Sequence, residues 1–219
     1  MLGALAAVLY GLTTQLRVRA VEISGVEGQL AAAIERSVGH GEMTLAASDP
    51  AALRSRLLAE FPDLAELHIS RQLPDRLLVE AVVRAPLALW VDEDQVIRLV
   101  DKDGTPYRPL ARNDVADLPI LRTSRRQLGE VGLLMGQLQA VDPALLASVS
   151  EVIAIGGDWK LNFDRGMQWL VPGGNDNGNR YRLLAELLHK PFWAGRSWHV
   201  DARSNERWYL RPARQGGFV

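Results

Sequence analysis

The chain has 219 residues, of which 47% are hydrophobic and 23% are charged. These proportions are typical of a folded globular protein and argue against a largely disordered chain. The formal net charge of -1 provides no bulk attraction to nucleic acid. The chain has no cysteine, which excludes a disulfide framework, cysteine-ligated zinc and a thiol nucleophile.

The N-terminus is an apolar run, MLGALAAVLYGLTTQL, with no charge before Arg17. A helix that crosses a membrane needs about 20 apolar residues, and this run is shorter. It also lacks the basic segment that opens a secretory signal. Three interpretations remain open: a short anchor, the end of an anchor that starts upstream of Met1, or a buried core helix. We favour a partial transmembrane anchor over residues 1–16, with a mis-assigned or trimmed start.

Residues 17–86 are expected to form a strand, two helices and a hairpin, in that order. Alternating residues over 17–24 predict the strand. Apolar residues at four-residue spacing predict the first helix, at Leu30, Ile34 and Val38. Ser48 or Asp49 before Pro50 indicates the start of the second helix. Two alternating runs on either side of a Leu-Pro-Asp-Arg turn predict the hairpin. Such a sheet, covered on one face by helices, leaves an edge strand available for partners.

Residues 87–212 are expected to form a mostly antiparallel β domain with flanking helices, which makes the whole chain α+β. The predicted strands span residues 87–91, 96–100, 149–155, 159–163, 167–171, 198–203 and 207–210. The predicted helices span residues 128–141, 143–147 and 179–189. Short glycine-containing turns predict that the strands between 149 and 171 form a meander. Residues 213–219 are expected to be a frayed tail.

The sequence contains no recognisable catalytic or metal-binding constellation. The four histidines do not have the spacing of metal ligands such as H-E-x-x-H. Asp101–Gly104 is similar to the start of a calcium loop, but the other ligands are missing and a hairpin turn explains it better. Asp92–Asp94 is interpreted as a solvated acidic turn. We therefore expect no enzymatic activity, no cofactor and no metal site.

Several segments, taken in order, resemble the FtsQ/DivIB family of bacterial cell-division proteins. They are VEISGVEG, FPDLAELHISRQLPDRLLVEAVVRAPLALW, LVDKDGTPYRPL, DLPIL, WKLNFDRGMQWLVPGG and WHVDARSNERWYLRP. The resemblance covers residues 18–212. It implies one membrane helix, a POTRA domain over residues 17–86 and a β domain over residues 87–212. Both domains are expected on the periplasmic side of the inner membrane, at the division septum.

The resemblance further implies a non-catalytic scaffold of the division machinery, the divisome. Its implied partners are FtsB- and FtsL-like single-span coiled-coil proteins and, through them, the septal peptidoglycan synthase, with no nucleic acid. In the family, the β domain binds FtsB by adding a strand to its last sheet edge. The matching positions are Val200, Asp201, Ala202, Arg203, Ser204, Trp208, Tyr209 and Leu210. We expect Arg203, in the V-D-x-R motif, to bind a partner carboxylate bidentately.

The chain departs from the family pattern at two places near this edge. Ser204 occupies a position where many members carry an aromatic residue, and Trp208 and Tyr209 are candidate replacements. Gly156–Asp158 lacks a basic residue that would be expected to assist the contact. Two alternative functions make different demands on the sequence. A POTRA protein of outer-membrane assembly or secretion would need several repeats and a barrel. A periplasmic cell-wall enzyme would need a nucleophile or a metal constellation.

Overall fold

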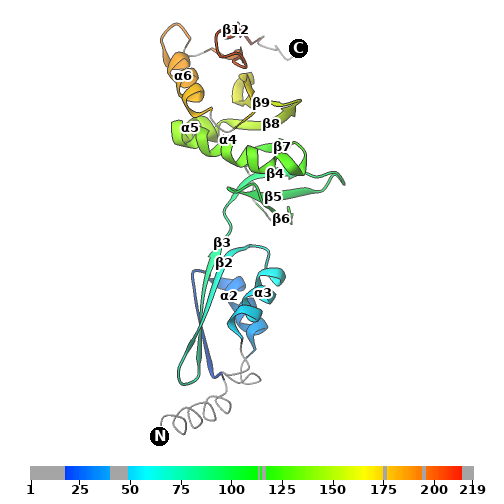
Figure 1. Ribbon diagram of the computed structural model, residues 1–219, viewed down its shortest axis with the longest axis vertical. Coiled ribbons are helices and arrows are strands. Elements are labelled where there is room, and N and C mark those ends of the chain that lie inside the picture. Colours follow the sequence, from blue (N-terminus) through cyan, green and yellow to red (C-terminus); the bar gives the residue numbers. More distant parts are fainter. Residues whose placement is uncertain are drawn as a thin grey trace. The chain divides into compact units, whose positions relative to one another are not determined.

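The computed structural model describes residues 18–39, 49–112, 114, 117–174, 177–193 and 196–213. The chain divides between Arg84 and Ala85 into two compact units, each with its own hydrophobic core. The fold is mixed α+β, as predicted (Figure 1). The anchor predicted over residues 1–16 lies outside the described residues, as does nearly all of the predicted tail. In the part of the chain that is described, no helix combines the length and the hydropathy needed to cross a bilayer.

The first unit has the predicted element order. Strand β1 (Ala20–Ser24) runs parallel to β3 (Arg76–Val83), and β3 runs antiparallel to β2 (Leu64–Gln72), so β3 is the central strand. Helices α2 (Gly28–Val38) and α3 (Pro50–Glu60) cover one face of this sheet (Figure 1). Their apolar stripes pack on the inward residues of the strands, which makes a core of Ile34, Val38, Leu53, Leu57, Leu67, Ile69, Leu77 and Val79, among others.

Local sequence accounts for two boundaries in the first unit. Asp49 caps α3, because its carboxylate accepts a hydrogen bond from the backbone N–H of Ala51 at 3.0 Å, and Pro50 fits the first helical turn. Gly25 follows β1 with φ of +82°, and a Cβ there would lie 1.9 Å from the carbonyl oxygen of Ala81. Only glycine fits this position, because any side chain would overlap the backbone of β3.

The second unit is built on a nine-stranded sheet in the order β12-β11-β10-β9-β8-β7-β4-β5-β6. Its strands are β4 (Pro86–Val91), β5 (Ile97–Asp101), β6 (Pro106–Pro109), β7 (Ile120–Arg122), β8 (Val149–Ile155), β9 (Asp158–Phe163), β10 (Gln168–Pro172), β11 (Trp198–Asp201) and β12 (Tyr209–Pro212). Of the eight neighbouring pairs, five are antiparallel, including the predicted meander β8-β9-β10, and three are parallel. The prediction of a mostly antiparallel sheet is confirmed. The predicted helical segments are α4 (Leu128–Val141), α5 (Pro143–Ala147) and α6 (Gly178–His189), with 3-10 turns η1 (Arg125–Gln127) and η2 (Asp164–Gly166).

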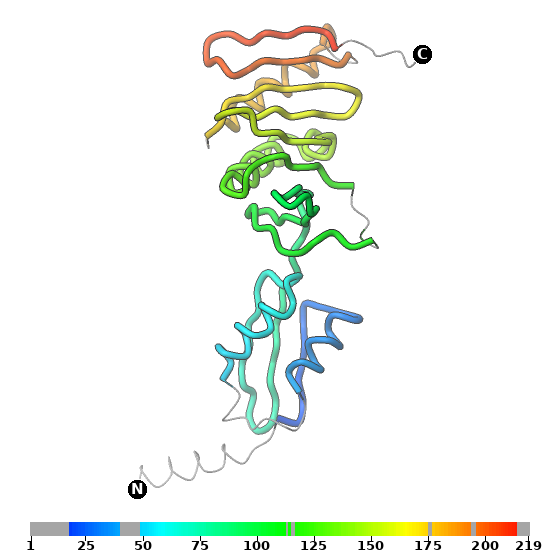
Figure 2. The backbone as a smooth tube through the Cα atoms, turned by 90° about the vertical axis from the view of Figure 1, so that its right-hand side faces the viewer, coloured from blue at the N-terminus to red at the C-terminus, as the bar shows by residue number. Residues whose placement is uncertain are grey.

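Helices α4 and α6 pack on the same face of the nine-stranded sheet and leave its other face open (Figures 1 and 2). The core between sheet and helices contains Val152, Trp159, Leu161, Trp169, Val171 and Val200 from the strands and Met135, Leu138, Tyr181 and Leu184 from the helices. Leu183 of α6 faces away from this core and is 44% exposed. The helix therefore buries Tyr181, Leu184 and Ala185.

Two glycines allow the turn after β5 to pack closely on α4. Gly104 has φ of +75°, and a Cβ there would lie 2.3 Å from the carbonyl oxygen of Leu128. A Cβ on Gly132 would lie 2.8 Å from the carbonyl oxygen of Lys102. Gly132 therefore serves a close approach of helix and turn. Gly136 does not, because a Cβ there would meet nothing within 4 Å.

The acidic turn after β4 differs from the prediction. Asp92 is buried, and its carboxylate accepts hydrogen bonds from the N–H groups of Asp94 at 3.0 Å and Val96 at 2.8 Å. It also accepts a bond from Arg98 Nε at 2.7 Å, and this bond is the main cause that lowers the pKa of Asp92. Glu93 and Asp94 are exposed, as expected of a solvated turn. Asp92 therefore organises the turn rather than facing solvent.

Candidate functional site

The predicted partner-binding residues gather at one end of the nine-stranded sheet. Val200 and Asp201 close β11, Ala202–Trp208 forms the connecting loop, and Tyr209 and Leu210 begin β12. Within the described residues β12 pairs with β11 alone, so it is the edge strand of the sheet. Figure 2 shows these two strands, in orange and red, as the outermost strands at this end of the unit.

The backbone of β12 directs part of its hydrogen-bonding capacity away from the sheet. The N–H of Ala213 donates to the carbonyl of Ser197 at 2.9 Å. Because antiparallel strands alternate in the direction of their polar groups, Arg211 faces β11 in the same way. Leu210 and Pro212 therefore direct their backbone groups outward. Leu210 offers a donor and an acceptor, whereas Pro212 offers only an acceptor.

Side chains at this edge divide between the core and the open face. Val200 and Ala202 are buried, so they support the edge from inside and present no side chain to a partner. Tyr209 is 66% exposed and lies on the open face. It borders a groove that crosses β10, β11 and β12 and is also lined by Leu170 and His199. The lining of the groove is mostly apolar, and the groove lies beside the edge strand β12.

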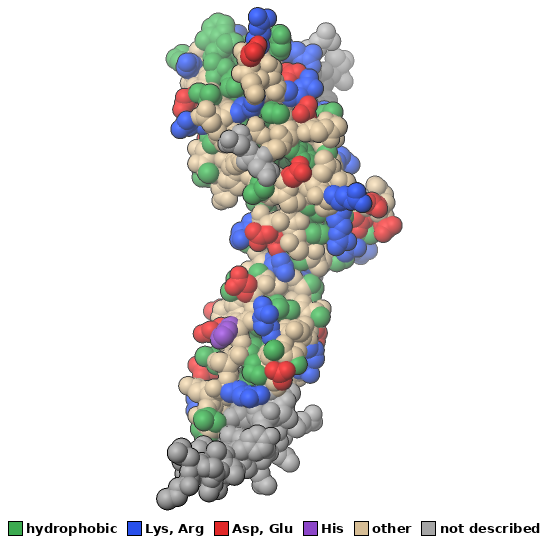
Figure 3. All heavy atoms as spheres, in the orientation of Figure 1, with side chains coloured by type: hydrophobic (Ala, Val, Ile, Leu, Met, Phe, Trp, Pro, Cys, Tyr) green, Lys and Arg blue, Asp and Glu red, His purple; other side chains and the backbone are tan. Residues whose placement is uncertain are grey.

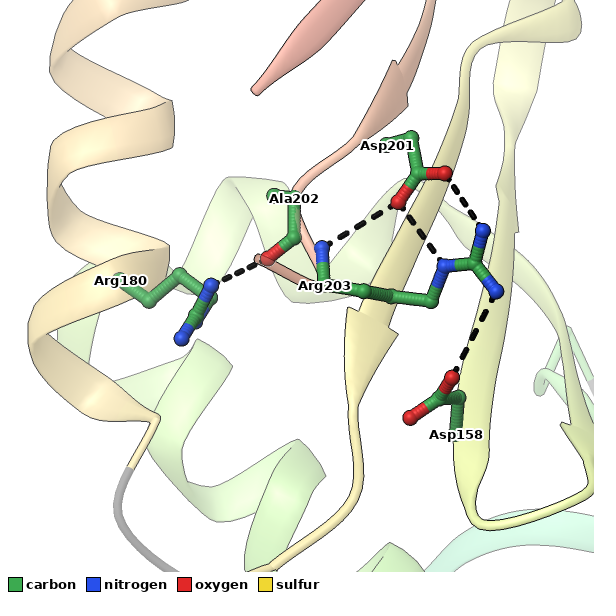
Figure 4. Close-up of polar contacts among 5 residues, drawn as sticks. All are labelled: Asp158, Arg180, Asp201, Ala202 and Arg203. Atoms are coloured by element: carbon green, nitrogen blue, oxygen red, sulfur yellow. Dashed lines mark hydrogen bonds and ion pairs between the residues drawn. The ribbon is translucent and has the colours of Figure 1, made fainter. Parts of the chain in front are cut away.

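Arg203 is held by two carboxylates of its own chain (Figure 4). Its Nε donates to Asp201 Oδ1 at 2.9 Å and its Nη2 donates to Asp201 Oδ2 at 2.6 Å. Its Nη1 lies 3.6 Å from Asp158 Oδ2. The hydrogen bond from Arg203 lowers the pKa of Asp201, and the carboxylate of Asp201 raises the pKa of Arg203. A partner carboxylate would have to share this guanidinium with Asp201, so the expected bidentate contact stays a prediction.

The loop after β11 is folded around the backbone carbonyl of Ser204. This oxygen accepts hydrogen bonds from Arg180 Nη1 at 3.0 Å and from Trp208 Nε1 at 3.1 Å. The Ser204 hydroxyl accepts a bond from the N–H of Glu206 at 3.2 Å. Trp208 is half-buried against the loop, whereas Tyr209 is exposed. Of the two aromatic residues considered as replacements at position 204, Tyr209 is the one that presents its ring to solvent.

The sequence interpretation missed two residues of this site. Asp158 lies at the start of β9, and only the sheet order brings it to Arg203. Gly156–Asp158 lacks a basic residue, and the acidic side chain of Asp158 is the informative signal in this segment. Arg180 lies in the first turn of α6 and was not singled out.

The described residues show no metal centre. They contain no group of three or more histidine and acidic side chains that could hold a metal ion. Figure 3 shows acidic and basic side chains interspersed on the visible face of each unit. This mixture of signs agrees with the net charge of -1.

Comparison with known proteins places the chain in a family. The profile "Cell division protein FtsQ/DivIB, C-terminal" matches residues 88–203, which is more than half of the chain. The chain is 27% identical over 199 residues to "Cell division protein FtsQ" of Novosphingobium aromaticivorans, which covers 89% of this chain and 61% of that protein. It is 32% identical over 126 residues to the protein of the same name from Zymomonas mobilis, which covers 57% of this chain and 39% of that protein. The chain thus spans less than two thirds of the length of either relative.

Among solved structures, the chain is similar to the major extracytoplasmic domain of the cell division protein DivIB from Geobacillus stearothermophilus. The two are 18% identical, and the match covers 51% of this chain and 91% of the other. The TM-score of 0.34 is too low to relate the two folds in detail. The profile match runs along the chain from β4 to the V-D-x-R segment at the end of β11 and the start of the following loop, and the chain therefore belongs to the FtsQ/DivIB family of cell division proteins.

Proposed function

We propose that this chain is a non-catalytic divisome scaffold that recruits FtsB- and FtsL-type proteins by strand addition to β12. Family membership supports the cell-division role. The observation that carries the binding mode is the outward-facing backbone of Leu210 on an edge strand. In strand addition, backbone hydrogen bonds supply affinity and alternate side chains supply specificity.

The proposal includes a location for the protein. The apolar run at residues 1–16 anchors it in the inner membrane as a single span, and the rest of the chain lies on the periplasmic side at the septum. Residues 17–86 act as a POTRA domain. Through its partners the protein is linked to the septal peptidoglycan synthase. The apolar N-terminal sequence and the family membership support this arrangement.

The edge sets the register of an added strand. One residue of the partner exchanges two backbone hydrogen bonds with Leu210, and the next donor of the partner reaches the carbonyl of Pro212. Partner side chains on the open face then lie beside Tyr209 and Arg211, next to the apolar groove. Side chains on the other face lie beside Leu210, at the border of the core.

The backbone nature of this contact can be tested at a single position. Leu210→Pro removes the outward N–H, and edge strands tolerate proline because the bonds to β11 do not involve that donor. Leu210→Ala removes the same side chain but keeps the donor, so it is the matched control. The partner probe is a peptide spanning the periplasmic part of an FtsB-type protein from the same genome.

We expect Leu210→Pro to weaken capture of this peptide by the full chain about tenfold relative to Leu210→Ala, because a partner carbonyl loses its donor. Tryptophan fluorescence spectra should show that both variants keep the fold of the second unit. Equal affinity of the two variants would refute strand addition at Leu210. Hydrolysis of purified peptidoglycan by the full chain would contradict the non-catalytic role.

A further inference from the structure

Arg180 occupies a position in α6 that helix electrostatics disfavour. The helix begins at Gly178, so Arg180 lies in its first turn. The N-terminus of a helix carries a partial positive charge, which favours acidic side chains and opposes basic ones. The contacts of Arg180 therefore have to compensate for its place in the helix.

Those contacts converge on the loop between β11 and β12. Arg180 Nη1 donates to the carbonyl of Ala202 and, at 3.0 Å, to the carbonyl of Ser204. Its Nη2 donates to Asn205 Oδ1 at 2.5 Å. Three acceptors from four consecutive loop residues thus meet one guanidinium. The planar fork of arginine suits such a set, and the charge strengthens each bond.

The first part of this loop is held from two sides (Figure 4). Arg180 reaches Ala202 from the helix layer, while Arg203 turns to the opposite side and reaches Asp201 and Asp158. The N–H of Ala202 also donates to Leu170 of β10 at 2.8 Å. The path of the chain out of β11 is therefore fixed by the helix layer and by two neighbouring strands.

The same contacts extend to the start of β12. Ser204 presents one carbonyl oxygen to both Arg180 and the indole N–H of Trp208. Trp208 directly precedes Tyr209, the first residue of the edge strand. Arg180 therefore fixes the carbonyl of Ser204, and this carbonyl in turn holds Trp208, the residue directly before β12.

We propose that Arg180 is a positioning residue for the partner edge. It fixes the loop Ala202–Trp208 and thereby presents β12 in the extended geometry that an incoming strand needs. Arg180 acts through this loop. The inference rests on the proposed function, because it concerns how the same edge is prepared for its partner. Pre-ordering the edge raises the fraction of molecules that are competent to bind.

The loop can be tested without any partner. Amide hydrogen exchange of the full chain compares Arg180→Ala with Arg182→Ala, an exposed arginine of the same helix that bonds Asn179 in the helix itself. We expect exchange in residues 203–209 to rise about tenfold or more in Arg180→Ala, as expected from the loss of charge-assisted bonds. Exchange in β8 and β9 should not change, and Arg182→Ala should resemble the unaltered chain. Arg180→Lys, a point charge without the fork, should fall between.

The edge is then tested with the FtsB-type peptide. We expect Arg180→Ala to lower the association rate about tenfold, since fewer molecules present an ordered β12, and to change the dissociation rate much less. Unchanged loop exchange, or an increase equal across the sheet, would overturn the positioning role. So would faster loop exchange with unchanged association. If the unaltered chain captures no peptide, the proposed function fails, and the role of Arg180 in presenting the edge fails with it. The hydrogen-exchange comparison needs no peptide, so it still shows whether Arg180 orders the loop. A failure of the proposed function is thereby distinguished from a failure of Arg180 to hold the loop.

Discussion

Replacing Gly132 by alanine should destabilise the second unit, although the same change normally stabilises a helix. Alanine is favoured over glycine in a helix interior by about 1 kcal/mol. At Gly132, however, the new Cβ would lie 2.8 Å from the carbonyl oxygen of Lys102 and 3.1 Å from the backbone nitrogen of Gly104. Both neighbours are backbone atoms of a hydrogen-bonded turn, and forcing such overlap costs about 1–3 kcal/mol. Gly136→Ala, one turn later in α4, meets nothing within 4 Å and should show the helical gain alone.

The tryptophans provide an assay that is specific to the second unit. All six follow residue 85 in the sequence. Tryptophan fluorescence during urea unfolding therefore reports the second unit while the first stays silent. We expect the free energy of unfolding of Gly132→Ala to lie about 1–3 kcal/mol below that of Gly136→Ala, with equal dependence on urea. A Gly132→Ala variant as stable as Gly136→Ala would refute the close approach of turn and helix.

Three further outcomes are expected. In Arg203→Ala the pKa of Asp201 should rise toward its usual 3.8, measured by NMR of the carboxyl carbon. Because the pKa of Asp201 is depressed in the folded chain, the stability that Asp201 contributes is present above its usual pKa. This stability is lost as the pH falls through the folded pKa. If the pKa of Asp201 did not move in Arg203→Ala, the pairing would be refuted. Asp49→Ala should lower the free energy of unfolding of the first unit by about 1 kcal/mol, because α3 loses its cap, whereas Asp49→Ser should be nearly neutral. Unfolding monitored by circular dichroism measures this difference. Gly25→Ala should disrupt the first unit alone, so unchanged helix content in that variant would contradict the tight turn after β1.

Local patterns in the sequence predict the helices and the hairpins well. Helix α4 begins and ends at the predicted residues, because Leu134, Leu138 and Val141 recur at helical spacing and Asp142-Pro143 stops it. Strand β6 was not predicted, since Pro106 and Pro109 are atypical of strands. Its place at the edge of the sheet explains why it tolerates them.

Long-range arrangement could not be obtained from the same patterns. The parallel pairing of β10 with β11 across α6 depends on which surfaces pack together, and the alternation within each strand does not encode this. The candidate site shows the same limit. Asp201 is visible as a neighbour of Arg203 in the sequence, but Asp158 and Arg180 reach the same segment only after the sheet and α6 have assembled.

The two outer strands of the nine-stranded sheet have a consequence for how copies of the protein behave when crowded. β6 and β12 each span four residues, and they end in proline at positions Pro109 and Pro212. Unprotected sheet edges act as templates on which further strands stack without limit, as in fibrils. Here each edge is short and lacks donors at its prolines, so a chain of copies joined sheet to sheet would be poorly bonded at every junction. Under the proposed function, the same short edge that receives one partner strand at Leu210 thus discourages open-ended polymerisation.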